Sequence, residues 1–94
     1  MAKAGGTLTA DTNAEVMGAD LQRQSVLIHN LETTSNHKIY VEFGTAASTT
    51  TSDGSFEVDS GENLELHVEN WPEIRGTINL KGAGTYSYIV RTSN

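Results

Sequence analysis

The stretch His37-Lys38-Ile39-Tyr40-Val41-Glu42-Phe43-Gly44 decides the fold class, because it is the clearest β-strand pattern in the sequence. Apolar and polar residues alternate along it until the glycine ends the pattern. One face consists of Ile39, Val41 and Phe43, and the other of Lys38, Tyr40 and Glu42. A period of two is typical of a strand with one buried face. We therefore predict a strand here that contributes its apolar face to a core.

Similar short runs recur outward from this stretch, at intervals of about 8–12 residues, with turn-forming residues between them. They lie at 24–31, 56–59, 63–69, 74–80 and 85–92, and the glycine-rich stretch 81–84 is a predicted turn. With no convincing helix, this spacing predicts an all-β fold, a small antiparallel β-sandwich or jelly roll of about 7 strands.

Two of these runs, 24–31 and 85–92, are apolar on both faces at some positions, as central or interface strands are. This favours a two-sheet sandwich. The polar cluster 32–36 predicts an antiparallel hairpin between 24–31 and the strand that begins at His37, with Val26 and Ile28 facing the same core.

The first part of the chain has little core material, so we divide the sequence into an N-terminal arm, 1–23, and a β-sandwich domain, 24–94. The arm is predicted to be extended, with one or two short strands around 7–10 and 14–17, and to need another surface to hold it. A short helix over 11–20 is the alternative, which its length and an internal glycine disfavour.

Composition narrows the classes of partner. The 94 residues include 6 Lys and Arg against 12 Asp and Glu, a net charge of -6, and no cysteine. Net negative charge repels phosphate backbones and anionic lipid, so neither nucleic acid nor a membrane is an expected partner. No apolar run approaches the roughly 20 residues that span a bilayer, which predicts a soluble protein made in a cytosol. A small core without disulfides favours association with other subunits.

Acidic residues are concentrated between Lys38 and Arg75, where there is no Lys or Arg. The acidic residues of this span are Glu42, Asp53, Glu57, Asp59, Glu62, Glu65, Glu69 and Glu73. Such a region is either a solvated face that blunts sheet pairing, or a calcium site or docking patch for a basic partner.

No catalytic, cofactor-binding or metal-ligating residue is predicted. The histidines, His29, His37 and His67, lie on three different predicted strands without a local ligand spacing, and cysteine is absent. No nucleophile elbow or pair of cleft-facing carboxylates is visible. We therefore expect a protein that is not an enzyme and needs no cofactor.

The segment 24–92, about three quarters of the chain, resembles small structural proteins of tailed-phage virions. The shared features are an apolar strand at 26–30, a polar turn at 32–36, Ile-Tyr-Val-x-Phe-Gly at 39–44, an Ala/Ser/Thr loop at 45–55, a Gly-Glu turn with Leu-x-Leu at 61–66, and a glycine hairpin at 82–90.

This resemblance implies a β-sandwich component of the virion. A short acidic chain with an N-terminal arm is most similar to capsid decoration, or cement, proteins, which bind the major capsid protein on the capsid exterior, often as trimers. The protein would then be made in the host cytoplasm. Candidate subunit or capsid contacts are Leu8, Val16, Met17, Trp71 and Arg75.

Trp71 leaves two alternatives open, because a tryptophan beside a proline either closes one end of the core or stands exposed as a binding anchor. A rival function follows from the second: a carbohydrate- or receptor-binding β-module of a phage tail or fibre, with Trp71, Tyr40 and Tyr86 or Tyr88 as stacking surfaces. A small hydrolase is a third hypothesis, which would need convergent acids or a metal.

Overall fold

The computed structural model describes residues 2–45, 47 and 55–94, and within them the chain forms eight strands and a short 3-10 helix. The elements are β1 (Ala2–Thr7), β2 (Ala14–Met17), β3 (Ser25–Asn30), β4 (Ile39–Phe43), β5 (Phe56–Val58), β6 (Asn63–His67), η2 (Pro72–Arg75), β7 (Ile78–Gly82) and β8 (Ser87–Ser93). The predicted loop 45–55 lies largely outside the described residues.

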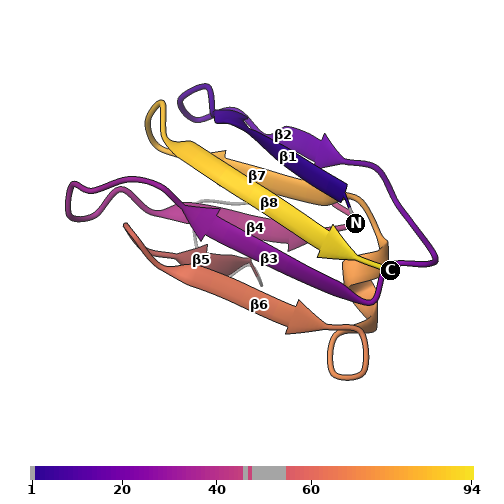
Figure 1. Ribbon diagram of the computed structural model, residues 1–94. Helices are drawn as coiled ribbons and strands as arrows, with labels where there is room; N and C mark the ends of the chain where they lie inside the picture. The colour runs from indigo at the N-terminus through magenta and orange to yellow at the C-terminus, as the bar shows by residue number, and fades with distance from the viewer. Residues whose placement is uncertain (1, 46, 48–54) are drawn as a thin grey trace.

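The strands form two stacked antiparallel sheets, with the orders β1-β8-β3-β6 and β2-β7-β4-β5 (Figure 1). Apart from β4 and β5, consecutive strands belong to different sheets, and this is the strand order of a jelly roll. The prediction of an all-β sandwich is confirmed, with eight strands in place of about seven.

The predicted hairpin between 24–31 and the strand that begins at His37 is wrong. β3 pairs with β6 and β8, whereas β4 pairs with β5 and β7, so β3 and β4 lie in opposite sheets. A polar connection of this length can return a chain to the same sheet or carry it across to the other, and its composition does not distinguish the two. The inward faces were predicted correctly, since Val26, Ile28 and the apolar face of β4 share one core.

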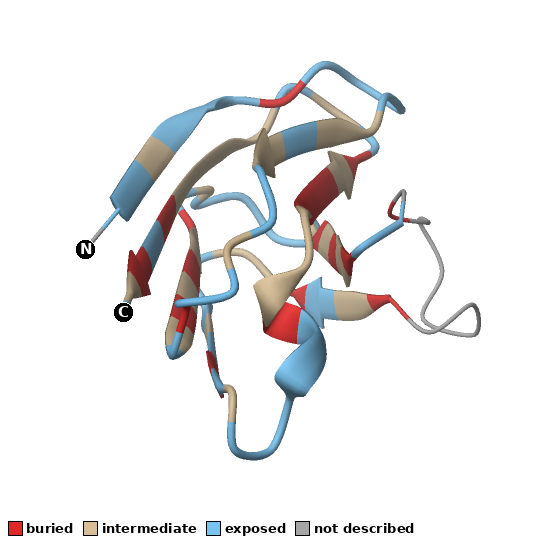
Figure 2. Ribbon diagram, turned by 90° about the vertical axis from the view of Figure 1, so that its right-hand side faces the viewer, coloured by how far each residue is buried: buried red, intermediate tan, exposed pale blue. Residues whose placement is uncertain are grey.

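The core lies between the two sheets and is almost entirely aliphatic. Figure 2 shows the buried positions alternating with more exposed ones along the central strands. Its buried members are Leu8, Val26, Ile28, Ile39, Val41, Phe43, Val58, Leu66, Ile74, Ile78, Leu80 and Val90.

The predicted strand 74–80 is partly wrong, because its first residues belong to η2. Pro72 starts this helix, where its missing N–H and fixed φ are tolerated. Ile74 points from the helix into the core and is fully buried. β7 begins only at Ile78 and continues through Gly82, so the predicted turn 81–84 starts too early. A Cβ at Gly82 would lie 2.7 Å from the ring of Tyr86, so a side chain does not fit there.

The N-terminal segment contributes an edge strand to each sheet. β1 pairs with β8 from Ala2 opposite Thr92 to Thr7 opposite Ser87, and β2 pairs with β7. Its strands are 2–7 and 14–17, so the first lies ahead of the predicted 7–10 and the second agrees. The surface that holds the segment is thus the rest of the same chain.

Candidate interaction surface

Most of the predicted contact residues lie at one end of the sandwich, where β2 ends and η2 lies (Figure 1). Val16 and Met17 are at the β2 edge of their sheet, whereas Trp71 packs on Phe56 at the opposite, β5 edge. We call the group of Val16, Met17, Trp71 and Arg75 the end surface. These side chains come from two segments more than 50 residues apart in sequence. Leu8 is not among them: it is 2% exposed and belongs to the core.

A buried arginine joins the two segments of the end surface. Arg23 is 3% exposed, and its Nη1 donates hydrogen bonds to the carbonyl oxygens of Ile74 at 2.8 Å and Gly76 at 2.9 Å. Its Nη2 donates to the carbonyl oxygen of Gly18 at 2.9 Å, and Arg75 Nε donates to the carbonyl oxygen of Arg23 at 3.0 Å. The guanidinium therefore fixes the chain after β2 against η2.

Burial lowers the pKa of the Arg23 guanidinium, and the nearby carboxylate of Asp20 opposes this shift. An arginine remains charged at neutral pH despite such a shift. Arg23 was not predicted as a structural residue. A single arginine ahead of a strand has no sequence pattern that distinguishes a buried side chain bonded to backbone carbonyl groups from an exposed one.

Val16 and Met17 are half-buried beside an open hollow of about 380 Å³, whose lining includes Ala2, Ala4 and Arg23. The hollow lies where the edge strands β1 and β2 separate. The side chains of Val16 and Met17 are thus accessible from outside at this end, although they also pack against the core.

Trp71 combines the two alternatives that the sequence left open. It is 38% exposed, yet its ring meets that of Phe56 edge to face, with centroids 5.1 Å apart. Phe56 in turn lies edge to face with Phe43, at 6.1 Å, so the indole continues an aromatic chain that reaches the core. One side of Trp71 closes this part of the sandwich, and the rest of the ring faces outward.

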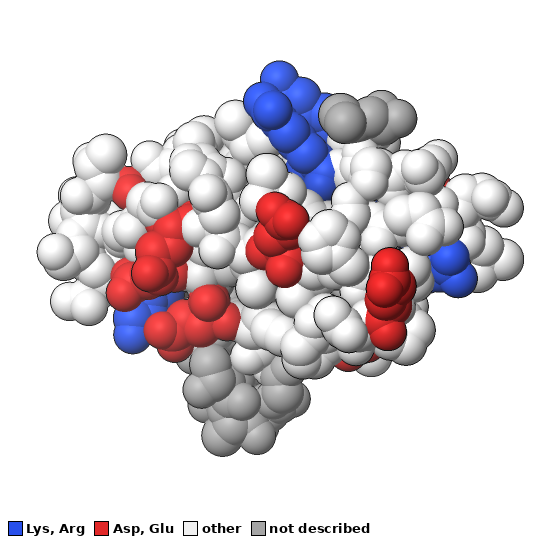
Figure 3. All heavy atoms as spheres, turned by 60° about the horizontal axis from the view of Figure 1, so that its bottom comes forward, with Lys and Arg blue, Asp and Glu red and all other residues white. Residues whose placement is uncertain are grey.

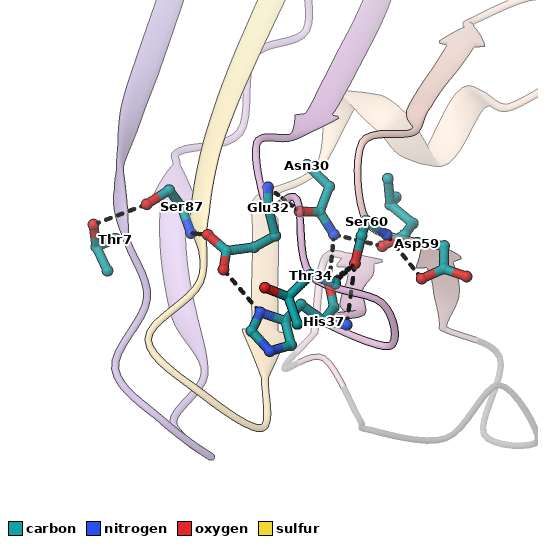
Figure 4. Close-up of polar contacts among 9 residues, drawn as sticks. Thr7, Asn30, Glu32, Thr34, His37, Asp59, Ser60 and Ser87 are labelled. Atoms are coloured by element: carbon teal, nitrogen blue, oxygen red, sulfur yellow. Dashed lines mark hydrogen bonds and ion pairs between the residues drawn. The ribbon is translucent and has the colours of Figure 1, made fainter.

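A polar cluster occupies the opposite end of the sandwich (Figure 4). The carboxylate of Glu32 contacts His37 Nδ1 at 2.9 Å and accepts a hydrogen bond from the backbone N–H of Ser87 at 2.8 Å. The hydrogen bond from Ser87, followed by the one to His37, lowers the pKa of Glu32. The imidazole of His37 also stacks on Tyr86, with ring centroids 4.5 Å apart.

The cluster continues through Asn30 to Ser60 (Figure 4). Asn30 Nδ2 donates to the carbonyl oxygens of His37 at 2.7 Å and Val58 at 2.9 Å, and Asn30 Oδ1 accepts from the backbone N–H of Glu32 at 2.9 Å. Ser60 Oγ accepts from the backbone N–H of His37 and not from its ring. These contacts tie the end of β3 to the connection before β4 and to the turn after β5, and the hydroxyl has no catalytic geometry toward the imidazole.

The three histidines have separate partners. His29 Nδ1 contacts Asn63 Oδ1, His67 Nε2 contacts Glu65 at 2.9 Å, and His37 belongs to the polar cluster. Within the described ranges, no group of three or more His, Asp or Glu side chains is arranged to hold a metal ion.

The acidic region follows β5, β6 and the loop after β6. Figure 3 shows its carboxylates in separate patches with neutral residues between them. Two of the acids are paired with a basic side chain or a histidine: Glu57 lies 3.3 Å from Lys38, and Glu65 forms the pair with His67.

The tyrosines of the predicted stacking surface are dispersed. Tyr40 lies between the inward residues of β4 and therefore on the outer face of its sheet. Tyr86 stacks on His37, and Tyr88 packs against the core. The structure does not bring these rings together with Trp71.

Comparisons with protein-family models and with curated proteins found no match to this chain. Among the described residues, no helix is both long and apolar enough to cross a membrane.

Proposed function

We propose that this protein is a non-enzymatic virion structural protein of the capsid-decoration type, which binds the major capsid protein on the outside of a tailed-phage capsid and stabilises the shell. The resemblance of segment 24–92 supports the proposal. The observation that carries it is the end surface, where an outward-facing Trp71 and the accessible apolar side chains of Val16 and Met17 lie at the same end of the sandwich.

The end surface suits binding because it is held in place before a partner arrives. Arg23 fixes both of its segments through three hydrogen bonds to backbone carbonyl groups. A rigid surface loses less conformational entropy on association than a mobile one. Tryptophan is also among the residues that most often dominate binding energy. Many copies bound to one shell would stabilise it by mass action.

Binding to capsids assembled without this protein tests the proposal, with co-sedimentation as the readout. We expect wild-type protein to bind, and Trp71→Ala and Met17→Asp each to weaken binding by about tenfold or more. Tyr40→Ala, on the outer face of β4 and away from the end surface, is the control and should bind like wild type. Deletion of residues 2–20 is unsuitable, because it removes β1, β2 and the core residue Leu8.

Two outcomes would contradict the proposal. One is the absence of wild-type binding to such capsids. The other is selective binding to glycans on an array, with capsid binding absent, which would favour the carbohydrate- or receptor-binding alternative.

A further inference from the structure

The outer face of the β1-β8-β3-β6 sheet carries apolar side chains that the sandwich does not cover. The two central strands, β3 and β8, place Leu27 and Ile89 on this face, and Leu31 follows at the end of β3 with 41% of its surface exposed. Their neighbours along the strands, such as Ile28 and Val90, are fully buried in the core. Strands apolar on both faces are typical of sheets covered on both sides.

This outer face is hollowed. One hollow of about 330 Å³ is lined by Leu27, His29, Leu31, Asn63, Ile89 and Arg91. A second hollow, of about 350 Å³, shares Leu27 and Arg91 with the first and reaches Glu65. Side chains projecting from a partner could therefore enter the face on either side of Leu27.

The charges on this face are arranged asymmetrically. The strand register places Lys3, Arg91, Leu27 and Glu65 in one row across the four strands. Lys3 and Arg91 are exposed and lie at one side of the sheet, whereas Glu65, on β6, is 61% exposed at the other. The row thus runs from two positive charges through an apolar residue to a negative charge.

We propose that a second copy of this chain docks on this face through a twofold axis. The axis lies between the two facing sheets, runs parallel to their strands and passes over the line between β8 and β3. This rotation reverses the order of the four residues across the strands, and each row faces the same row of the second copy. Lys3 then faces Glu65 of the second copy, and Arg91 covers Leu27 of the second copy. The next row places Ile89 against His29 of the second copy.

A second copy is favoured over another partner because the face is complementary to itself. In a twofold interface every contact occurs twice, so one row supplies two Lys3–Glu65 pairs and covers both copies of Leu27. Electrostatic complementarity of this kind fixes the register of an interface. Two antiparallel sheets pack face to face in this way in ordinary sandwiches.

The face measures about 19 Å across four strands and about 20 Å along them. This is at the low end for a specific interface, so the dimer should be weak and depend on concentration. The proposed dimer does not rest on capsid binding, although Lys3 also lines the hollow beside Val16 and Met17. It differs from the trimer that the phage resemblance implies.

Sedimentation velocity over a range of protein concentrations tests the dimer through a charge swap. We expect wild-type protein to approach twice the monomer mass at high concentration. Lys3→Glu and Glu65→Lys should each weaken dimerisation by about tenfold, because each places like charges opposite one another, and the double variant should restore it. Lys81→Glu changes the net charge equally on the other sheet and should dimerise like wild type.

Both exchanged side chains lie on exposed edge-strand positions, and circular dichroism would verify that each variant folds. A second variant, Ile89→Asp, should abolish dimerisation while leaving the fold intact. A wild-type protein that is monomeric at every concentration, a trimer, or a dimer insensitive to both single charge changes and to Ile89→Asp would overturn the proposal.

Discussion

Asn30 shows how a single polar residue can hold a jelly-roll crossing in place. It lies at the end of β3 and is fully buried, and its side chain makes three hydrogen bonds to backbone groups of His37, Val58 and Glu32. Glu32 and His37 belong to the connection that carries the chain from β3 to β4 in the other sheet, and Val58 ends β5. A buried amide that is fully partnered specifies one path of the chain, since any other path leaves polar groups without partners.

We expect Asn30→Ala to lower the free energy of unfolding by about 2–4 kcal/mol, because it removes three hydrogen bonds and leaves buried carbonyl groups unpartnered. Urea unfolding followed by circular dichroism measures the change. Asn70→Ala, at an exposed position after β6, is the matched control and should stay within about 0.5 kcal/mol of wild type. Equal stability of the two variants would show that Asn30 is not needed for the crossing.

Glu32 links stability to pH. Its pKa is lower in the folded protein because of the hydrogen bonds from Ser87 and His37. A carboxyl group of this kind stabilises the fold above its unfolded-state pKa of about 4.3, and the stabilisation is lost as pH falls through the lower folded-state value.

We therefore expect the urea midpoint of wild type to fall as the pH is lowered from about 5 to about 3, and the fall to be shallower in Glu32→Gln. The comparison is made against Glu69→Gln, a change at an exposed residue after β6. Parallel pH profiles for wild type and Glu32→Gln would contradict the role of this carboxylate.

At the scale of elements, the connection from β2 to β3 and the helix η2 behave as one unit because Arg23 joins them. Three carbonyl groups, from Gly18, Ile74 and Gly76, accept its hydrogen bonds, and the backbone N–H of Asp20 donates to the carbonyl oxygen of Arg75 at 2.9 Å. The β2–β3 connection and η2 are not joined by strand pairing. Their alignment depends on this side chain.

Arg23→Ala should lower the free energy of unfolding by about 3 kcal/mol, since it leaves buried carbonyl groups without donors. Hydrogen exchange should also accelerate at the amide of Asp20, whose hydrogen bond to the carbonyl oxygen of Arg75 joins the same two segments. Arg23→Lys should recover only part of the loss, because an ammonium group does not reproduce the planar fork of donors. Unchanged exchange at Asp20 in Arg23→Ala would rule out this coupling.

The strands themselves were largely predictable, and their partners were not. Alternation identified β4 and the apolar faces of β3 and β6, because a half-buried strand needs a period of two wherever it lies. The same alternation misassigned Ile74, which reaches the core from a helical turn instead of a strand. The pairing of β3 with β6 and β8 depends on contacts distant in sequence, for which a local pattern holds no information.

The candidate surfaces were predictable to a similar degree. Val16, Met17 and Trp71 could be selected because apolar residues in weakly patterned segments need a partner. Leu8 satisfies the same criterion, but its partner proved to be the core of its own chain. Arg23 had no signal, since its partners are backbone carbonyl groups that every residue possesses.

At the scale of the whole molecule, the jelly-roll order places the first and last strands side by side. β1 pairs antiparallel with β8 over the full length of β1, with Ala2 opposite Thr92. Both ends of the chain therefore lie at the same end of the sandwich, beside the hollow that Val16 and Met17 line (Figure 1).

This neighbourhood makes the molecule suited to circular permutation. A short flexible linker from residue 94 to residue 2 would bridge adjacent strands, and new termini could open at the turn around Gly61, where the backbone is exposed. We expect such a permutant to keep the wild-type circular dichroism spectrum and to unfold cooperatively. A permutant that fails to fold, when the same linker is tolerated as an extension of either native terminus, would contradict this.

The same geometry also bears on how the protein could carry cargo. A peptide fused ahead of residue 2 or after residue 94 emerges next to the end surface and would compete with whatever binds there. A peptide fused to the permuted ends would emerge from the far end of the sandwich and point away from it.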